Sequence, residues 1–224
     1  MFDYHQEGDI AVLNIDDGKA NAVSFDFIAQ MNENLDRAEK EAKAVVFTGR
    51  PGRFSAGFDL SVMQGGGFEE MAKLVLQGAG MMLRLFTFPL PVVAASSGHA
   101  IAAGGFMLLS SDTRIGTKGD FKIGLNETAI GMTLPVFGFQ LAKARLAPTH
   151  FTPAVIQAKM YDPEGAIDAG FLDQVVAADD LLPTAIEAAT TLAAFPADAY
   201  LGNKLGMRSQ FIEAMKESQA KNIP

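Results

Sequence analysis

A long uncharged segment in the middle of the chain does most to restrict the possible folds. Residues 85–111 carry no Asp, Glu, Lys or Arg, and the segment is long enough to cross a bilayer. It is interrupted, however, by turn-forming residues such as Pro89, Pro91, Gly98 and Gly104. A lipid-exposed backbone could not satisfy its hydrogen bonds through such breaks. The segment is therefore predicted to be buried in the interior of a globular domain and not in a membrane.

Charge and composition narrow the possible partners. Among 224 residues there are 18 Lys and Arg against 26 Asp and Glu, a formal net charge of −8. An acidic chain without a basic tail does not attract nucleic acid or an anionic membrane, so neither is expected as a partner. The chain has no Cys, which excludes a disulfide scaffold and a thiol nucleophile. Its three His, at positions 5, 99 and 150, lack metal-ligand spacing, so no metal site is expected.

The ends of the chain carry no recognisable targeting signal. Residues 1–8 are polar and acidic, whereas a signal peptide begins with basic residues and continues with apolar ones. We therefore expect a cytoplasmic protein.

Strand-like and helix-like patterns alternate to about residue 160, which predicts an α/β fold around one core. The short apolar runs typical of buried strands are 10–15, 44–48 and 91–96. Apolar residues at helical spacing predict a helix after the capping residue Ser24 and another over about 68–86, and small residues predict a third near 104–110.

The last third of the chain differs in pattern. Three segments are predicted to be helices that pack outside the sheet-containing core or against another subunit: 163–169, 181–195 and 203–221. We expect one continuous unit with a core over residues 1–160 and a C-terminal helical region, involved in oligomerisation, over residues 161–224.

Three short segments carry the functional prediction. They are 53–60 (RFSAGFDL), 97–112 (beginning SGHAIAAGGF) and 123–127 (IGLNE), the last followed by Gly131 and Pro135. Small residues let a backbone approach a ligand closely, and a helix that begins there directs free N–H groups outward. Two such peptides facing each other would form an oxyanion hole. Each segment alone is common turn chemistry, whereas the three in this order and spacing are specific.

Through these segments the chain resembles the crotonase (enoyl-CoA hydratase/isomerase) superfamily. The resemblance extends from 21–24 (NAVS) to 169–176 (AGFLDQVV), and within the family 54–60 and 123–127 are most similar to the Δ3,Δ2-enoyl-CoA isomerases. It implies the crotonase-like (ClpP/crotonase) α/β fold, a spiral of ββα units with a C-terminal helical region. The chain departs from the family at its C-terminus, which is shorter than the family's lid-forming helices.

The resemblance also implies a ligand and an assembly. An acyl-CoA of fatty-acid metabolism would be the substrate, and no separate cofactor is implied because coenzyme A enters as part of the thioester. A homotrimer, or a hexamer made of two trimers, would be the assembly.

Site residues follow from the resemblance, position by position. The two oxyanion-hole N–H groups fall on Phe58 and Ala103, with Gly104 as the neighbour if the register shifts by one. The hydratases carry two glutamates; the first of these positions is Phe106 here, and the second falls at Glu127, where the isomerases place their base. The remaining substrate contacts are implied at Ala56, Gly57, Asp59, Leu60, Gly104, Phe106 and Asn126.

One carboxylate is enough for isomerisation but not for hydration. Adding water across a double bond requires a base and an acid, whereas moving the bond from C3 to C2 requires one base that removes a proton at C2 and returns it at C4. Phe106 in place of the first glutamate would also dry the pocket. The apolar neighbours of Glu127 should raise the pKa of its carboxyl toward the working pH. These observations favour an isomerase.

Alternatives stay open at this point. Another crotonase chemistry, such as weak hydration, thioester hydrolysis or dienoyl isomerisation, would need an acid such as Glu69, Glu70 or Asp120. A non-catalytic acyl-CoA-binding protein would need none. The cations nearest the relevant loops are Lys19, Arg50 and Arg53, for which CoA phosphate binding and a solvated surface role are equally compatible.

Some polar residues near the motifs are assigned structural roles. Asp59 is expected to cap a loop or helix. His99 is expected to be a hydrogen-bonded interior residue, because no Ser and carboxylate partners are identifiable. Asp112 and Arg114 are expected to form a pair or to cap the helix that ends before them.

Overall fold

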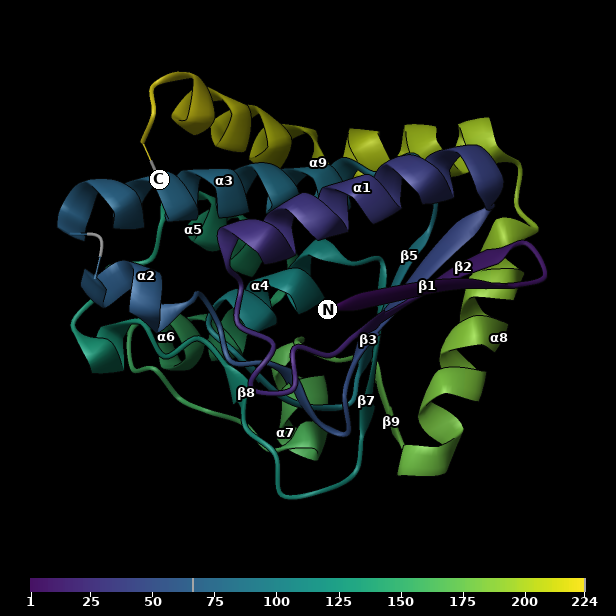
Figure 1. The fold of residues 1–224 in the computed structure, drawn as a ribbon, viewed down its shortest axis with the longest axis horizontal. Coiled ribbons are helices and arrows are strands. Elements are labelled where there is room, and N and C mark those ends of the chain that lie inside the picture. Colours follow the sequence, from purple (N-terminus) through teal and green to yellow (C-terminus); the bar gives the residue numbers. More distant parts are fainter. Residues whose placement is uncertain (66, 224) are drawn as a thin grey trace.

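Two sheets lie at the centre of the computed structural model, which describes residues 1–65 and 67–223 (Figure 1). The larger sheet has the strand order β1-β2-β3-β5-β7-β9 and is parallel except for the antiparallel β1–β2 pair. Its strands are β1 (Phe2–Glu7), β2 (Ile10–Ile15), β3 (Ala44–Gly49), β5 (Val92–Ser96), β7 (Thr113–Thr117) and β9 (Gln174–Val176). The smaller, parallel sheet contains β4 (Gly52–Ser55), β6 (Gly98–Ile101) and β8 (Ile123–Gly124).

The chain repeats one pattern: a strand in the larger sheet, a strand in the smaller sheet, and a helical segment. β3-β4, β5-β6 and β7-β8 follow this pattern in turn, which confirms the expected spiral of ββα units. The helices are α1 (Phe25–Glu41), α2 (Leu60–Gly65), α3 (Gly67–Thr87), α4 (Ala103–Ser110), α5 (Val136–Arg145), α6 (Pro148–Val155), α7 (Pro163–Ala169), α8 (Leu181–Ala193) and α9 (Ala197–Ala220), with 3-10 turns η1 (Thr128–Ile130) and η2 (Ala178–Asp180).

The inner strands β2, β3 and β5 are buried on both faces of the larger sheet, as their uninterrupted apolar runs predict, whereas the edge strands β1 and β9 are partly exposed. In β2, Ala11, Leu13 and Ile15 pack into the main core, whereas Ile10 and Val12 face the opposite side. The main core lies between the sheets and the helices α1, α3, α4 and α5, and α8 covers the opposite face. Figure 1 shows α8 along one side of the strands, with α1, α3 and α9 gathered along another.

The uncharged segment 85–111 is buried in this core, as predicted. It supplies the end of α3, then β5 and β6, and finally α4, whose residues Ala103–Ser110 are all buried. No helix within residues 1–65 and 67–223 combines the length and apolar character needed to cross a membrane.

Two predicted caps position the elements that flank the site. The Ser24 hydroxyl accepts the Phe27 N–H at 3.1 Å and begins α1. The Asp59 carboxylate accepts the Ser61 N–H at 2.8 Å and begins α2, so its expected capping role is confirmed. Each bond satisfies a backbone donor that the first helical turn would otherwise leave unpaired.

The C-terminal region contains the three predicted helices, as α7, α8 and α9, which confirms that part of the prediction. The prediction missed β9, which pairs with β7 at the edge of the larger sheet, so the region is not wholly outside the sheet-containing core. Helix α8 packs directly on β3, β5 and β7. It can do so because Leu181, Ala185 and Ala189 form one narrow apolar stripe at four-residue spacing.

Helix α9 is anchored by buried charges that the apolar pattern did not reveal. The Asp112 carboxylate lies 2.7 Å from the Lys204 ammonium and 2.8 Å from the Arg208 guanidinium, and all three side chains are buried. Arg114 instead pairs with Asp173. The prediction of an Asp112–Arg114 pair is therefore wrong, because each residue finds a partner that is distant in sequence.

Candidate active site

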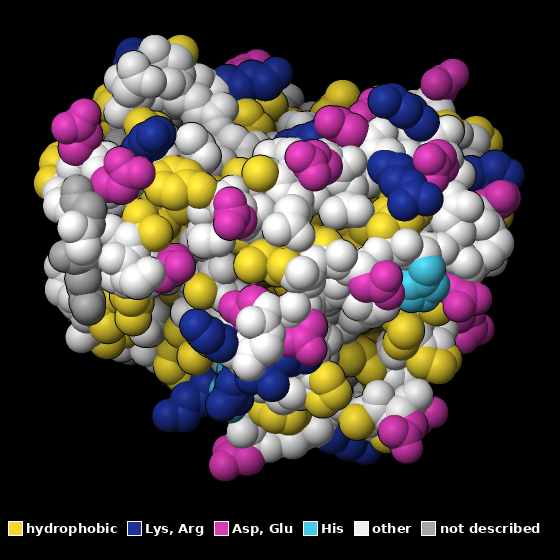
Figure 2. All heavy atoms as spheres, in the orientation of Figure 1, with side chains coloured by type: hydrophobic (Ala, Val, Ile, Leu, Met, Phe, Trp, Pro, Cys, Tyr) yellow, Lys and Arg dark blue, Asp and Glu magenta, His cyan; other side chains and the backbone are white. Residues whose placement is uncertain are grey.

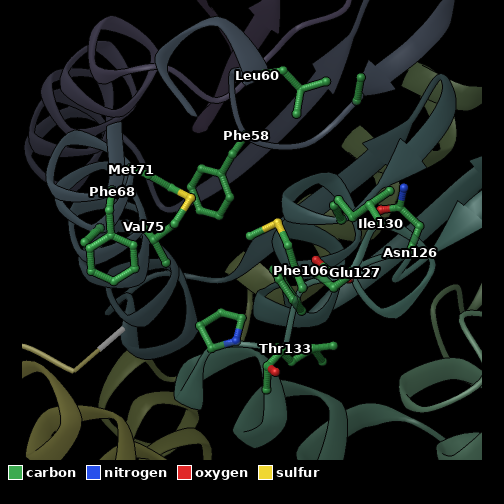
Figure 3. A pocket seen from close by; sticks show the side chains of 17 residues that line it. Phe58, Leu60, Phe68, Met71, Val75, Phe106, Asn126, Glu127, Ile130 and Thr133 are labelled. Carbon is green, nitrogen blue, oxygen red and sulfur yellow. The ribbon is translucent and has the colours of Figure 1, made fainter. Parts of the chain in front are cut away.

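A cavity of about 810 Å³ opens between the first half of α3 and the segment that joins β8 to α5. Figure 3 shows Phe58, Met71 and Val75 on one side of it and Phe106 and Glu127 on the other. Its wall is apolar except at a few positions. The residues with side chains around the cavity are Ala56, Phe58, Leu60, Phe68, Met71, Ala72, Val75, Ala102, Phe106, Asn126, Glu127, Ile130, Met132, Thr133, Leu134 and Pro135.

Glu127 brings a carboxylate into this apolar setting. The residue is only 5% exposed, and burial raises the pKa of its carboxyl from 4.5 to about 7. Its Oε2 atom is buried and has no hydrogen-bond partner within the part of the chain that the structure describes. The backbone is fixed, because the Glu127 carbonyl accepts N–H groups of Ile130 at 3.1 Å and Met132 at 2.9 Å. The expected rise in pKa is confirmed. A carboxyl group whose pKa lies near neutral pH is suited to proton transfer.

The backbone amide of Phe58 is left free by the way its peptide is held. The Gly57 carbonyl accepts the Val23 N–H at 2.8 Å, and the Asp59 N–H donates to the Val23 carbonyl at 3.1 Å. In a trans peptide the C=O and N–H point in opposite directions. The Phe58 N–H therefore points away from Val23, and among the described residues it has no hydrogen-bond acceptor.

A second free amide begins helix α4. Ala103 is the first residue of α4, and its N–H has no acceptor within residues 1–65 and 67–223. Ala102 before it lines the cavity and has a positive φ of 52°, while its carbonyl accepts the Phe106 N–H at 3.0 Å along the helix. This geometry directs the Ala103 N–H out of the helix start, where the helix dipole favours negative charge.

The two free amides belong to backbones in close contact. A Cβ atom built on Gly57 would lie 3.0 Å from the Ala102 Cβ and 3.6 Å from the Ala103 nitrogen. Gly57 has a φ of 100°, a conformation that side-chain-bearing residues rarely adopt. Glycine at this position therefore permits the approach of the loop after β4 to the start of α4. Such a pair of unpaired donors can stabilise an oxyanion.

Phe106 takes part in an aromatic cluster against the cavity. It is fully buried and packs edge-to-face on Phe137, with ring centroids 5.1 Å apart and an interplanar angle of 73°. A Cβ on Gly138 would lie 2.8 Å from the Phe106 ring, so that glycine makes space for the ring. An apolar ring occupies this part of the wall.

The structure brings together many, but not all, of the predicted site residues. Ala56, Phe58, Leu60, Phe106, Asn126 and Glu127 line the cavity. Gly57, Asp59, Ala103 and Gly104 do not line it. Gly104 lets α4 pack on the Ser55 backbone, since a Cβ there would lie 2.5 Å from the Ser55 carbonyl oxygen.

The residues considered as alternative acids lie away from the cavity wall. Glu69 and Asp120 are exposed, and neither they nor Glu70 line the cavity. His99 accepts the Lys122 N–H at 2.9 Å through Nδ1 and packs on the Phe121 ring, so it has the hydrogen-bonded role that was expected.

Much of one cavity wall was missed by the sequence interpretation. Phe68, Ala72 and Val75 of α3 line the cavity together with Met71. Phe68 is 81% exposed, but its exposure is known only from the fold; in the sequence it appears as the start of an ordinary apolar helix face, so no local signal marked this wall.

The cations considered for CoA phosphates, Lys19, Arg50 and Arg53, do not line the cavity. Lys19 and Arg53 are exposed, and the Arg50 guanidinium donates to the Lys19 carbonyl. On the face shown in Figure 2, Lys and Arg side chains are interspersed with Asp and Glu. A phosphate-binding role for these three cations stays a prediction.

Comparison with known proteins shows to which family the chain belongs. The model of the enoyl-CoA hydratase/isomerase family matches residues 5–222. The chain belongs to the enoyl-CoA hydratase/isomerase (crotonase) family. It is 30% identical to mitochondrial enoyl-CoA delta isomerase 1 of Homo sapiens over 203 residues, 89% of this chain and 67% of the relative. It is also 30% identical to a probable enoyl-CoA hydratase of Mycobacterium tuberculosis over 211 residues, 89% of this chain and 78% of the relative.

The crotonase fold is matched along the whole chain. The structure of an enoyl-CoA hydratase/isomerase family protein from Pseudomonas syringae superposes with a TM-score of 0.95 at 41% identity, covering 99% of this chain and 96% of that one. The chain spans about two thirds of the length of the human, rat and mouse isomerases it matches (67%, 62% and 66%). Its relatives carry isomerase and hydratase names at similar identity, so family membership fixes an acyl-CoA enzyme but not which of the two reactions it catalyses.

Proposed function

We propose that this crotonase is a Δ3,Δ2-enoyl-CoA isomerase with one catalytic carboxylate. The Glu127 carboxylate removes a proton from C2 of a 3-enoyl thioester, and the electron pair of that bond moves toward the carbonyl to give a dienolate. The same carboxyl group then returns the proton to C4, which leaves a double bond between C2 and C3. No atom is gained or lost, and the base is regenerated.

The free amides of Phe58 and Ala103 are proposed to bind the thioester oxygen. Negative charge builds up on that oxygen when C2 is deprotonated, and donors that are already aimed stabilise it without reorganisation. Each such donor is typically worth about 10²–10³ in rate. The apolar cavity would hold the acyl chain, with coenzyme A present as part of the thioester and no separate cofactor.

One observation carries the proposal. Among the described residues that line the cavity, Glu127 contributes the one carboxylate, and the fully buried ring of Phe106 stands where the hydratases are expected to carry their first glutamate. Hydration needs both an acid and a base, whereas isomerisation needs one group that acts as each in turn. A raised pKa favours this dual use, because the carboxylate is then a stronger base toward the C2 proton and is still substantially ionised near neutral pH.

A hydratase is the second candidate, supported by the hydratase names among the relatives. It would require a second acid–base group beside Glu127, and the described residues that line the cavity include no second carboxylate.

An activity panel tests the proposal. Purified protein is given 3-enoyl-CoA, 2-enoyl-CoA and saturated acyl-CoA, and products are separated by chromatography. Conversion of 3-enoyl-CoA to 2-enoyl-CoA, with negligible hydration, is expected. Robust 3-hydroxyacyl-CoA formation would overturn the proposal, release of free CoA would indicate a thioesterase, and binding without turnover would indicate a non-catalytic protein.

We also propose a homotrimer, or a dimer of trimers, formed through the C-terminal region. Met207 of α9 is 68% exposed, and Phe195 between α8 and α9 is 54% exposed, which would suit contacts between subunits. Analytical ultracentrifugation at micromolar concentration should give the mass of a trimer or hexamer, and a monomer would contradict it.

A further inference from the structure

A buried polar connection lies behind the Phe58 amide, in the NAVS element that the proposed chemistry does not use. Asn21 is fully buried, and its side-chain amide donates to the carbonyls of Ile15 at 2.9 Å, Arg53 at 3.0 Å and Phe54 at 3.3 Å. These bonds tie the end of β2 to β4. One side chain thus holds β4, the strand that precedes the loop containing Gly57 and Phe58.

Ser55 continues the connection from this strand into the loop. Its hydroxyl donates to the Asn21 carbonyl at 2.8 Å and accepts the Gly57 N–H at 3.3 Å. Ser55 also lies close to the start of α4, which carries the free Ala103 amide, because a Cβ on Gly104 of α4 would lie 3.1 Å from the Ser55 Cβ. Ser55 therefore lies behind both free amides.

The Asn21 turn is itself held in place from the surface side. The Asp17 carboxylate accepts the N–H groups of Lys19 at 2.7 Å and Asn21 at 2.9 Å, and the Asn21 side-chain oxygen accepts the Asp17 N–H at 3.0 Å. Asn21 has a φ of 51°, which asparagine tolerates better than most residues. The turn then extends to Val23, whose N–H donates to the Gly57 carbonyl and whose carbonyl accepts the Asp59 N–H, one bond on each side of Phe58 along the chain.

We infer that Asn21 and Ser55 are positioning residues that aim the Phe58 amide at the thioester oxygen. The inference rests on the proposed function in one respect, since it takes that oxygen to bind at the Phe58 N–H. Neither side chain touches the substrate: Asn21 and Ser55 are both absent from the cavity wall defined by the described residues. They act on the Ala56–Gly57 peptide, whose N–H donates to the Ser55 hydroxyl, and so restrict the position of the next peptide, which carries the Phe58 N–H. Small errors in donor placement reduce catalysis strongly.

Ser55→Ala tests this inference against a matched control. The change removes the hydroxyl that joins the Asn21 carbonyl to the Gly57 N–H. Ser111→Ala removes an equally buried hydroxyl, which donates to the Met107 carbonyl at 2.9 Å at the other end of α4. Both variants lose one internal hydrogen bond to a backbone carbonyl, but only the first lies behind the free amides.

The measured quantity is the absorption spectrum of a bound probe. The probe is a 2-enoyl-CoA whose double bond is in electronic conjugation with an aromatic ring that carries an amino group. Hydrogen bonds to the carbonyl oxygen of such a probe draw electron density onto it and move its absorption to longer wavelength. We expect the wild type to produce this shift, Ser55→Ala to lose at least half of it, and Ser111→Ala to retain it. In turnover, Ser55→Ala should lower kcat about ten- to hundred-fold, less than removal of a whole donor, with KM little changed.

Retention of the full shift and full kcat by Ser55→Ala would overturn the inference, as would an equal loss in Ser111→Ala. If Ser55→Ala fails to fold, as judged by circular dichroism, Asp17→Asn at its partly exposed position provides the test, and a partial loss of the shift is expected. An unchanged shift in that variant would overturn the inference. A wild type that shifts the probe without converting 3-enoyl-CoA would refute the proposed isomerase but not the positioning role.

Discussion

Replacing Glu127 by Gln should make the protein more stable while it removes activity. The substitution keeps the shape of the side chain but cannot take up a proton from C2. A positioned acid–base group contributes about 10²–10⁴ in rate, so kcat should fall by at least about 10². Acyl-CoA affinity should change little, because the free amides and the apolar wall are untouched.

The gain in stability follows from the environment of the carboxylate. Burial raises its pKa from 4.5 to about 7, and one pKa unit corresponds to about 1.4 kcal/mol. Since the folded-state pKa is raised, the wild type is destabilised as pH increases from the unfolded-state pKa through the folded-state pKa. Relative to the Gln variant, the free energy of unfolding of the wild type should be lower by about 1 kcal/mol at pH 5.5 and by roughly 3 kcal/mol at pH 8.5.

Urea unfolding of both proteins at pH 5.5 and pH 8.5, together with their kcat values, measures both effects. Glu69→Gln is the control, because it neutralises an exposed carboxylate outside the cavity and should change neither quantity. A Glu127→Gln variant with near-normal kcat would show that the base lies elsewhere. A variant that is less stable than the wild type at pH 8.5 would refute the account of a buried, uncompensated carboxylate.

Three other perturbations follow from the same structure. Activity (kcat/KM) should rise with pH and level off above an apparent pKa near 7, since Glu127 must be ionised to accept a proton; a rate independent of pH from 5.5 to 8.5 would contradict this. Gly138→Ala should press on the Phe106 ring, which a new Cβ would approach to 2.8 Å, and should raise KM for long acyl chains more than for short ones in a chain-length series; Gly202→Ala, whose Cβ meets nothing within 4 Å, is the control. Asp112→Asn should lower the free energy of unfolding by about 3–5 kcal/mol, because it leaves Lys204 and Arg208 buried without a carboxylate. The matched change Asp9→Asn, in an exposed pair with Lys43, should cost at most about 1 kcal/mol in urea unfolding.

Strands and helices that depend on interactions between neighbouring residues could be predicted from the sequence. The apolar run Ile10–Ile15 and the Ser24 cap were enough to predict β2 and the start of α1, because both signals lie within a few neighbouring residues. β9 was missed because Gln174–Val176 is short and partly exposed, and it is a strand only through its pairing with β7. The anchoring of α9 was missed for a related reason: Lys204 and Arg208 are buried only because Asp112, far away in sequence, lies opposite them.

The candidate site shows the same division. Glu127, Phe58 and Phe106 could be placed because each lies in a short motif whose order along the chain is specific. The α3 wall could not be assigned to the cavity from sequence, since the apolar face that holds Met71 and Val75 reads as ordinary core until its neighbours are known. The role of Asn21 depends on carbonyls of three residues on two strands, which the fold alone brings within reach of one amide.

In the proposed reaction one carboxylate in an apolar pocket moves a double bond and adds no water. Turnover of 3-enoyl-CoA in water labelled with oxygen-18, followed by mass spectrometry of the products, distinguishes isomerisation from hydration. We expect accumulation of unlabelled 2-enoyl-CoA with negligible labelled 3-hydroxyacyl-CoA. Formation of labelled 3-hydroxyacyl-CoA at a rate comparable to isomerisation would contradict it.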